Sequence, residues 1–192
     1  MGETLRTFIA VELPDSLHKE LAQLETILRR SGADVKWVNP ENIHITLKFL
    51  GYVTPENIKK IEKLLDGLAR PFAPFSITAE GIGAFPKLLY PRVIWVGIKD
   101  TSGKIKEIAE KLDDALLKLG FEKESREFTA HLTLGRVRSL KNKEKLKELI
   151  EKNPFSCDID IQVGKVVLFK STLTQSGSIY TKLHEAIFKE RT

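Results

Sequence analysis

The stretch NIHITLKF, residues 42–49, has a counterpart in TAHLTLG, residues 129–135. Each stretch contains a histidine, an apolar residue, a threonine and a second apolar residue. Side chains two positions apart on a strand point to the same face, so we expect His44 and Thr46 on one face and His131 and Thr133 on one face of a second strand. The opposite face of each strand is apolar and is expected to be buried; it comprises Ile43, Ile45, Leu47 and Phe49 in the first stretch and Ala130, Leu132 and Leu134 in the second.

The composition is that of a soluble globular protein. Of the 192 residues, 42% are hydrophobic and 30% are charged, and no run reaches the roughly 18 apolar residues of a spanning helix. The first residues lack an apolar signal core, which predicts a cytoplasmic location. The single cysteine, Cys157, excludes an internal disulfide and a Cys-rich zinc site. The excess of Lys and Glu over Asn, Gln, Met and Cys favours a thermophilic source as a hypothesis.

Hydrophobic periodicity and turn residues predict alternating strands and helices. The expected strands cover residues 5–13, 35–38, 42–49, 75–82, 92–98, 129–135, 155–161, 165–169 and 179–188. The expected helices cover residues 14–32, 54–71, 101–119 and 142–152, and residues 83–91 are expected to form a loop.

The two halves of the chain match in spacing. Phe8 precedes His44 by 36 residues, and Trp95 precedes His131 by the same 36. This indicates an internal duplication and an α+β fold with two pseudo-symmetric lobes, in which each lobe is an antiparallel sheet with helices on its outer face. We expect one bilobal domain over residues 1–192, with approximate halves 1–90 and 91–192 and an active-site cleft between the lobes.

Two histidines and two threonines across a cleft suit phosphodiester chemistry. An imidazole has a pKa near ~6.5, so one histidine can accept a proton while the other donates one. Threonine hydroxyls can donate hydrogen bonds to non-bridging phosphoryl oxygens. A cyclic phosphate fits well, because its ring keeps the leaving oxygen close to phosphorus. The motifs carry no Asp or Glu at metal-ligand spacing, so we expect neither a metal nor another cofactor.

The pair of His-x-Thr-x motifs resembles the signature of the 2H phosphoesterase superfamily. Within it, the chain is similar to the bacterial and archaeal RNA 2′,3′-cyclic phosphodiesterases, historically called 2′-5′ RNA ligases. The similarity covers nearly the whole chain and includes Arg6-x-Phe8-Ile9-Ala10-x-x-Leu13-Pro14, Leu47-x-Phe49-Leu50-Gly51, Pro91-Arg92-Val93-Ile94-Trp95, Leu134-Gly135-Arg136 and Ser171-x-Leu173-x-x-x-Gly177-x-x-Tyr180.

The resemblance implies hydrolysis of an RNA 2′,3′-cyclic phosphate to a 2′-phosphate end, which releases the 3′ oxygen; together with the absence of metal-ligand spacing, this predicts a metal-independent reaction. It assigns His44 as the proton donor to the leaving oxygen and His131 as the base that activates water. Thr46, Thr133 and Arg136 would bind the phosphoryl oxygens. Strict alternation places Arg136 on the face opposite His131, so it needs the bulge or strand end that Gly135 permits to reach the site. The near-twofold symmetry leaves open which histidine is acid and which is base.

Two alternatives stay open: 2′-5′ RNA end-joining as the main reaction, and a non-catalytic module that binds RNA or nucleotides. The expected partner is RNA with cyclic phosphate ends, tRNA fragments among them, bound by a monomer with no membrane contact. A net charge of +5 suits such a polyanion, although a solvated lysine-rich surface also explains it.

Other polar and aromatic residues have ordinary explanations. Lys48 is expected to be exposed, although it shares the His44 face, and Trp95 is expected in the core. We interpret His18 and His184 as structural or solvated and leave Tyr180 undecided. Trp37 and Phe85 can stack a base, and the run from Lys141 to Lys152 is typical of a solvated helix face.

Overall fold

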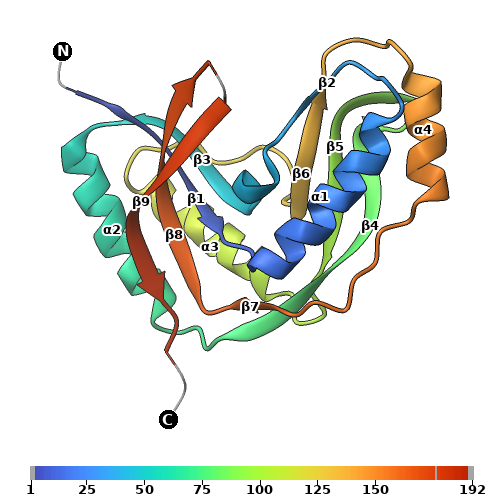
Figure 1. Ribbon diagram of the computed structural model, residues 1–192. Helices are drawn as coiled ribbons and strands as arrows, with labels where there is room; N and C mark the ends of the chain where they lie inside the picture. Colours follow the sequence, from blue (N-terminus) through green and yellow to red (C-terminus); the bar gives the residue numbers. More distant parts are fainter. Residues whose placement is uncertain (1–2, 176, 190–192) are drawn as a thin grey trace.

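The computed structural model describes residues 3–175 and 177–189 and contains one curled antiparallel sheet with four α-helices (Figure 1). The strands are β1 (Leu5–Val11), β2 (Val35–Trp37), β3 (Ile45–Val53), β4 (Phe75–Lys87), β5 (Tyr90–Lys99), β6 (His131–Val137), β7 (Ile161–Val163), β8 (Lys165–Thr174) and β9 (Gly177–Ile187). The helices are α1 (Asp15–Arg29), α2 (Pro55–Ala69), α3 (Lys104–Leu117), α4 (Lys143–Lys152) and the short 3-10 helix η1 (Pro40–Asn42).

The strand order is β7-β4-β5-β6-β3-β1-β8-β9, and β2 pairs with β6 beside this path. Strands β3 and β6 sit at its centre and meet through a single pair, Ile45 opposite Leu132. Both side chains of this pair are completely buried. The two sides of the sheet are therefore joined at the two histidine motifs.

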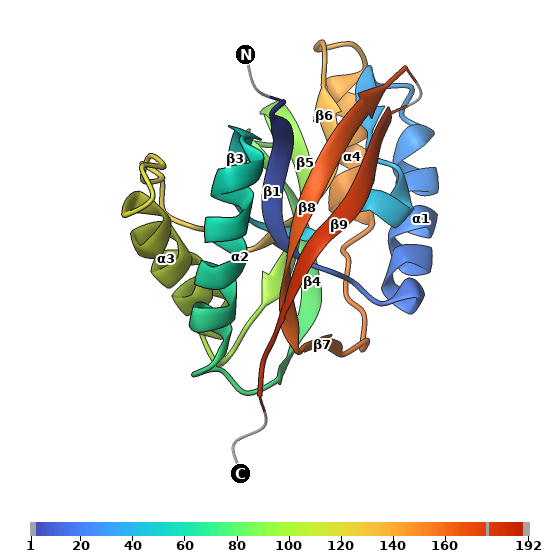
Figure 2. The ribbon, with the colours of Figure 1, turned by 90° about the vertical axis from the view of Figure 1, so that its left-hand side faces the viewer.

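The helices divide between the two sides of the sheet. Helices α2 and α3 contact each other and pack against β3, β8 and β9, whereas α1 and α4 contact each other on the β6 side (Figures 1 and 2). Helix α2 begins as expected, with Pro55 in its first turn and the Thr54 hydroxyl accepting a hydrogen bond from the Asn57 N–H. The apolar faces of the helices join one large core with the sheet, in which Ile9, Ile45 and Leu132 are among the most buried side chains.

The two sides of the sheet do not follow the order of the chain. Strands β8 and β9 come from the last part of the chain, yet β8 pairs with β1. Helix α1 follows β1 but packs beside α4, and α3 follows β5 but packs against β3. Each side of the molecule thus combines segments from both parts of the sequence.

Three expectations about elements were wrong. The loop expected over 83–91 is strand, because β4 continues to Lys87 and turns directly into β5 at Tyr90. The strand expected over 155–161 reduces to an isolated bridge between Glu80 and Ser156, followed by the short β7. His44 itself lies just before β3, although the sequence placed it inside the strand. No helix in the described part of the chain has the length and apolar composition to cross a membrane.

Candidate active site

The two motifs meet around the single pair that joins β3 and β6. Ile45 of β3 lies opposite Leu132 of β6 in an antiparallel pair, so this pair is flanked by His44 and Thr46 in one motif and by His131 and Thr133 in the other. Ile45 and Leu132 point into the core, so these four side chains lie on the other face, which we call the histidine face. The sequence prediction that the two motifs face one site is consistent with this register.

Both imidazoles are held by the same local hydrogen bond. His44 Nδ1 lies 2.8 Å from the carbonyl oxygen of Asn42, and His131 Nδ1 lies 2.7 Å from that of Thr129. A carbonyl can only accept, so each Nδ1 carries the proton, and Nε2 of the neutral ring remains the basic atom. The sequence analysis did not predict these two carbonyl acceptors. Both belong to the residue two positions before a motif histidine, and this common spacing is the only sequence feature that relates them.

Aromatic rings surround His44. Its ring stacks on Phe8, with centroids 4.7 Å apart, and the ring of Tyr180 meets it edge-on at 5.4 Å. Burial lowers the pKa of His44 to about 4; the Asn42 carbonyl opposes this shift and the charge of His18 adds to it. His44 is therefore neutral near pH 7.

His131 lies in a less enclosed position. The ring of Phe85 meets it edge-on, with centroids 5.1 Å apart. Burial lowers the pKa of His131; the hydrogen bond to Thr129 opposes the shift, and the positive charge of Arg136 contributes to it. A bound phosphodiester anion would act in the opposite direction on both imidazoles, because it favours their charged forms.

A bulge in β6 brings Arg136 onto the histidine face. Trp95 of β5 lies opposite Thr133, but the next β5 residue, Ile94, lies opposite Gly135, so Leu134 is the extra residue. Arg136 then lies opposite Val93 and returns to the face that carries Thr133 and His131. The sequence analysis required a bulge or a strand end at Gly135; the structure has a bulge, one residue earlier, at Leu134.

An equivalent bulge in β3 corrects two expectations. Ile9 lies opposite Lys48 and Ala10 lies opposite Thr46, so Leu47 is the extra residue. Lys48 is therefore turned from the histidine face, with its side chain only 10% exposed: its Nζ contacts the Asp113 carboxylate and donates to the Glu122 carbonyl at 2.7 Å. The sequence analysis expected an exposed lysine.

Phe49 is turned the other way by the same bulge. It was expected in the core with Ile45 and Leu47, but it is 60% exposed, and its ring lies 6.1 Å from that of Phe8. A bulge shifts the alternation by one residue, so a pattern of apolar residues on one face cannot be continued across it.

Trp95 also lies on the histidine face, where the sequence analysis expected a core residue. It is half-buried opposite Thr133. Its indole packs over Gly83, where a β-carbon would lie 2.5 Å from the ring, and its centroid is 5.2 Å from that of Phe85. Trp37, in contrast, packs on the core side and lies beneath the Arg29 guanidinium.

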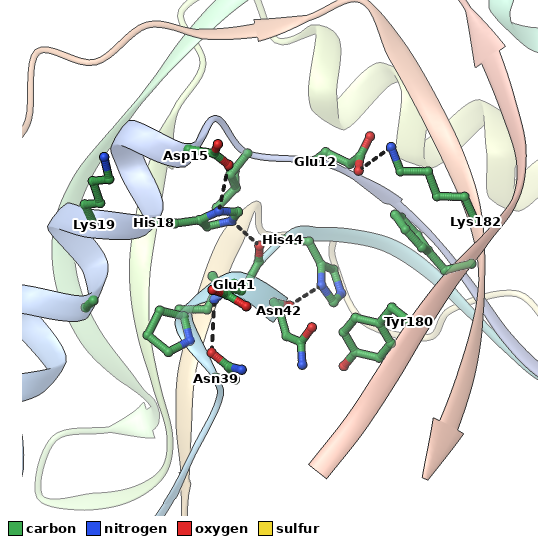
Figure 3. Close-up of a pocket in the computed structure, with 15 residues that line it drawn as sticks. Glu12, Asp15, His18, Lys19, Asn39, Glu41, Asn42, His44, Tyr180 and Lys182 are labelled. Atoms are coloured by element: carbon green, nitrogen blue, oxygen red, sulfur yellow. Dashed lines mark hydrogen bonds and ion pairs between the residues drawn. The ribbon is translucent and has the colours of Figure 1, made fainter. Parts of the chain in front are cut away.

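A cavity of about 790 Å³ opens beside His44 (Figure 3). Its lining includes Asn42 and Tyr180, which flank the His44 ring, and His18 from α1. His18 Nε2 lies 3.2 Å from the Ile43 carbonyl, so it is a structural residue that holds the backbone just before His44. The lining does not include His131, so this cavity represents one side of the site.

The remaining histidine has a structural partner, and the histidines do not form a metal cluster. His184 Nε2 lies 2.7 Å from the Asp66 carboxylate, as expected for a structural residue. Within residues 3–175 and 177–189, no group of three or more His, Cys, Asp or Glu side chains has the arrangement to hold a metal ion. The prediction of metal independence is left to experiment.

The fold and the site together define a class of protein: a duplicated α+β domain whose two His-x-Thr motifs share one face of a curled sheet. The family model for LigT-like phosphoesterases matches the chain twice, over residues 11–95 and 96–180. The chain belongs to the LigT-like phosphoesterase family, and the twofold match supports the internal duplication.

Relatives and solved structures agree with this assignment. The chain is 39% identical to the RNA 2′,3′-cyclic phosphodiesterase of Methanocaldococcus jannaschii, over 94% of this chain and 99% of that protein. It is 36% identical to the protein of the same name from Methanothermobacter thermautotrophicus, over 93% and 96% of the two chains. The crystal structure of Escherichia coli LigT with 3′-AMP has the same fold, with a TM-score of 0.81 at 22% identity over 98% of this chain and 100% of that chain.

Proposed function

We propose that this protein hydrolyses RNA 2′,3′-cyclic phosphodiester ends to 2′-phosphomonoesters by general acid–base catalysis with two histidines and without a metal. The observation that carries the proposal is the equivalent placement of His44 and His131, each with Nδ1 on a carbonyl and Nε2 free for proton transfer. The names of the relatives, RNA 2′,3′-cyclic phosphodiesterase, supply the substrate class.

In the proposed reaction, His131 Nε2 takes a proton from water as the water oxygen attacks phosphorus. The bond from phosphorus to the 3′ oxygen breaks, and His44 gives its Nε2 proton to that oxygen. Thr46 and Thr133, beside the histidines in the register, donate to the non-bridging oxygens, where charge increases. Arg136 adds positive charge on the same face.

The acid role of His44 requires that substrate raise its pKa. At about 4, the His44 pKa leaves little imidazolium at pH 7. A phosphodiester anion beside the ring favours the protonated form, so binding and protonation are coupled. The register alone does not decide which histidine is acid, and we take the assignment from the family resemblance.

The decisive experiment is turnover of a 2′,3′-cyclic nucleotide by His44→Ala and His131→Ala. Each variant should lose at least ~10²-fold in kcat, since each removes a proton-transfer group. His184→Ala is the matched control, because that ring binds Asp66 and not the site. If either motif variant retains the turnover rate of the wild type, the proposal is wrong. If the wild-type protein binds the nucleotide tightly without turnover, a binding module is favoured.

Two further assays refine the proposal. Activity should persist in excess chelator; a loss that added metal restores would contradict metal independence. RNA with cyclic phosphate ends, offered together with RNA bearing a 5′-hydroxyl, should give 2′-phosphate ends as the main product. If 2′-5′-joined RNA predominates, end-joining is the principal reaction. We further propose that the enzyme acts as a cytoplasmic monomer.

A further inference from the structure

Three exposed cations line up on the histidine face beyond the catalytic motifs. Lys36 of β2 lies directly opposite Arg136 of β6, so their side chains share a face. The pairing of β2 with β6 is extended by one further hydrogen bond, in which the Arg138 N–H donates to the Asp34 carbonyl at 2.8 Å. Arg138 is two residues beyond Arg136 and therefore lies on the same face. All three side chains are exposed. We call Lys36, Arg136 and Arg138 the cation row.

The cation row lacks neutralising partners. Across the described residues, 3–175 and 177–189, no carboxylate oxygen lies within 4.0 Å of a side-chain nitrogen of Lys36, Arg136 or Arg138. Helix lysines behave differently: Lys60 pairs with Glu56 at 2.7 Å, and Lys111 pairs with a glutamate one turn away at 2.6 Å. The row therefore contributes three positive charges, without carboxylate partners among the described residues, to a chain of net charge +5, and these charges can attract a polyanion.

The cation row is continuous with the candidate active site. Arg136 lies opposite Val93, and Val93 lies opposite Phe85, so these residues form one line across the histidine face. Phe85 contacts the His131 ring edge-on, and the charge of Arg136 reaches His131 strongly enough to contribute to its lowered pKa. The row thus begins at Arg136, near His131, and leads away from that histidine along β2 and the end of β6.

We propose that the cation row binds backbone phosphates of single-stranded RNA adjacent to the reacting end, so that an RNA strand is a better substrate than a free cyclic nucleotide. This inference rests on the proposed function, which places one phosphodiester at the inner end of the row. An RNA strand repeats its negative charge at every nucleotide, as the row repeats its positive charge along the strand. Contacts of this kind carry no base specificity.

The test compares two substrates in the double variant Lys36→Ala/Arg138→Ala. For an RNA oligonucleotide ending in a 2′,3′-cyclic phosphate, kcat/KM should fall about tenfold or more. The slope of log KM against the logarithm of the salt concentration should decrease by about 1.4, which is about 0.7 for each of the two lost phosphate contacts. For the corresponding 2′,3′-cyclic mononucleotide, kcat/KM should stay unchanged, since that substrate has no second phosphate to lose.

The matched control is Lys60→Ala/Lys111→Ala, which removes the same net charge from α2 and α3 and should affect neither substrate. Equal losses on both substrates, equal losses in the control, or no loss on the oligonucleotide would each overturn the proposal. Failure of the proposed function is a separate result: wild type would then turn over neither substrate. In that case, the binding of a labelled 3′-hydroxyl RNA, measured by fluorescence anisotropy, still tests the cation row. The double variant should bind this RNA more weakly than wild type.

Discussion

At the scale of single residues, two nearly equivalent imidazoles acquire unequal environments. Both donate Nδ1–H to a carbonyl two residues earlier, but His44 is enclosed by Phe8 and Tyr180 while His131 is more open. Burial lowers both pKa values, that of His44 to about 4. The duplicated site is therefore symmetric in its hydrogen bonds and asymmetric in its proton affinities.

This asymmetry predicts the pH dependence of catalysis. The active form needs one protonated and one neutral histidine, so kcat/KM should be bell-shaped and reach its maximum between the two apparent pKa values of the free enzyme. Both histidines have pKa values lowered from 6.5, so the maximum should lie on the acidic side of neutral. The kcat profile should be displaced to higher pH, because bound phosphodiester favours imidazolium. A kcat/KM maximum above neutral pH would contradict this.

At the scale of elements, the bulges in β3 and β6 explain which side-chain directions were predictable. Alternation from each histidine correctly pairs it with the threonine two residues on, since no bulge intervenes. The same rule fails for Lys48 and Phe49, because the extra residue Leu47 shifts the alternation. A bulge depends on pairing with a neighbouring strand, here β1, and is not encoded in the periodicity of β3 alone.

Gly135→Ala tests the junction of β2 with β6. A β-carbon at Gly135 would lie 2.6 Å from Val35 Cγ1 and 3.3 Å from the Lys36 carbonyl oxygen, so β2 must move away. We expect the free energy of unfolding to decrease by about 1–3 kcal/mol, as in other overpacked sites. Gly164→Ala is the control, since nothing lies within 4 Å of its β-carbon. Equal stability of both variants in urea unfolding would show that β2 is not tightly packed there.

Lys48→Met tests the buried ion pair between β3 and α3. The Lys48 and Asp113 side chains are only 10% and 12% exposed, and Asp113 also accepts from the Glu124 N–H. Removing the lysine leaves a buried carboxylate without its cation, so the unfolding free energy should fall by about 3 kcal/mol or more. Lys48→Met/Asp113→Leu should recover most of this loss. Lys60→Met, at an exposed pair, should change little, and an equally large loss there would refute the explanation.

At the scale of the whole molecule, the sequence predicts the duplication but not the exchange of segments between the two sides. The matched spacing and the paired motifs indicate two related units and a shared site. No local pattern indicates that β8 leaves β7 to pair with β1, or that α1 and α3 pack away from the strands that precede them. These arrangements follow from burial of a common core around Ile45 and Leu132, a property of the assembled sheet.

The stability of the whole molecule should depend on pH through the active site. An unfolded histidine has a pKa near 6.5, whereas His44 in the folded protein has a pKa of about 4. Between these values the unfolded state binds more protons, so the free energy of unfolding should rise with pH across this window and level off above it. The full difference for His44 amounts to about 3 kcal/mol.

Urea unfolding at pH 4 to 8 measures this dependence, with His44→Gln as the matched variant because it cannot titrate. The difference in unfolding free energy between wild type and His44→Gln should be pH-dependent below 6.5 and constant above. Other groups with shifted pKa values, such as Glu12, are present in both proteins and cancel in this difference. A difference that stays constant across the whole range would mean that the His44 pKa is not lowered by folding, and the acidic maximum predicted for kcat/KM would lose its basis.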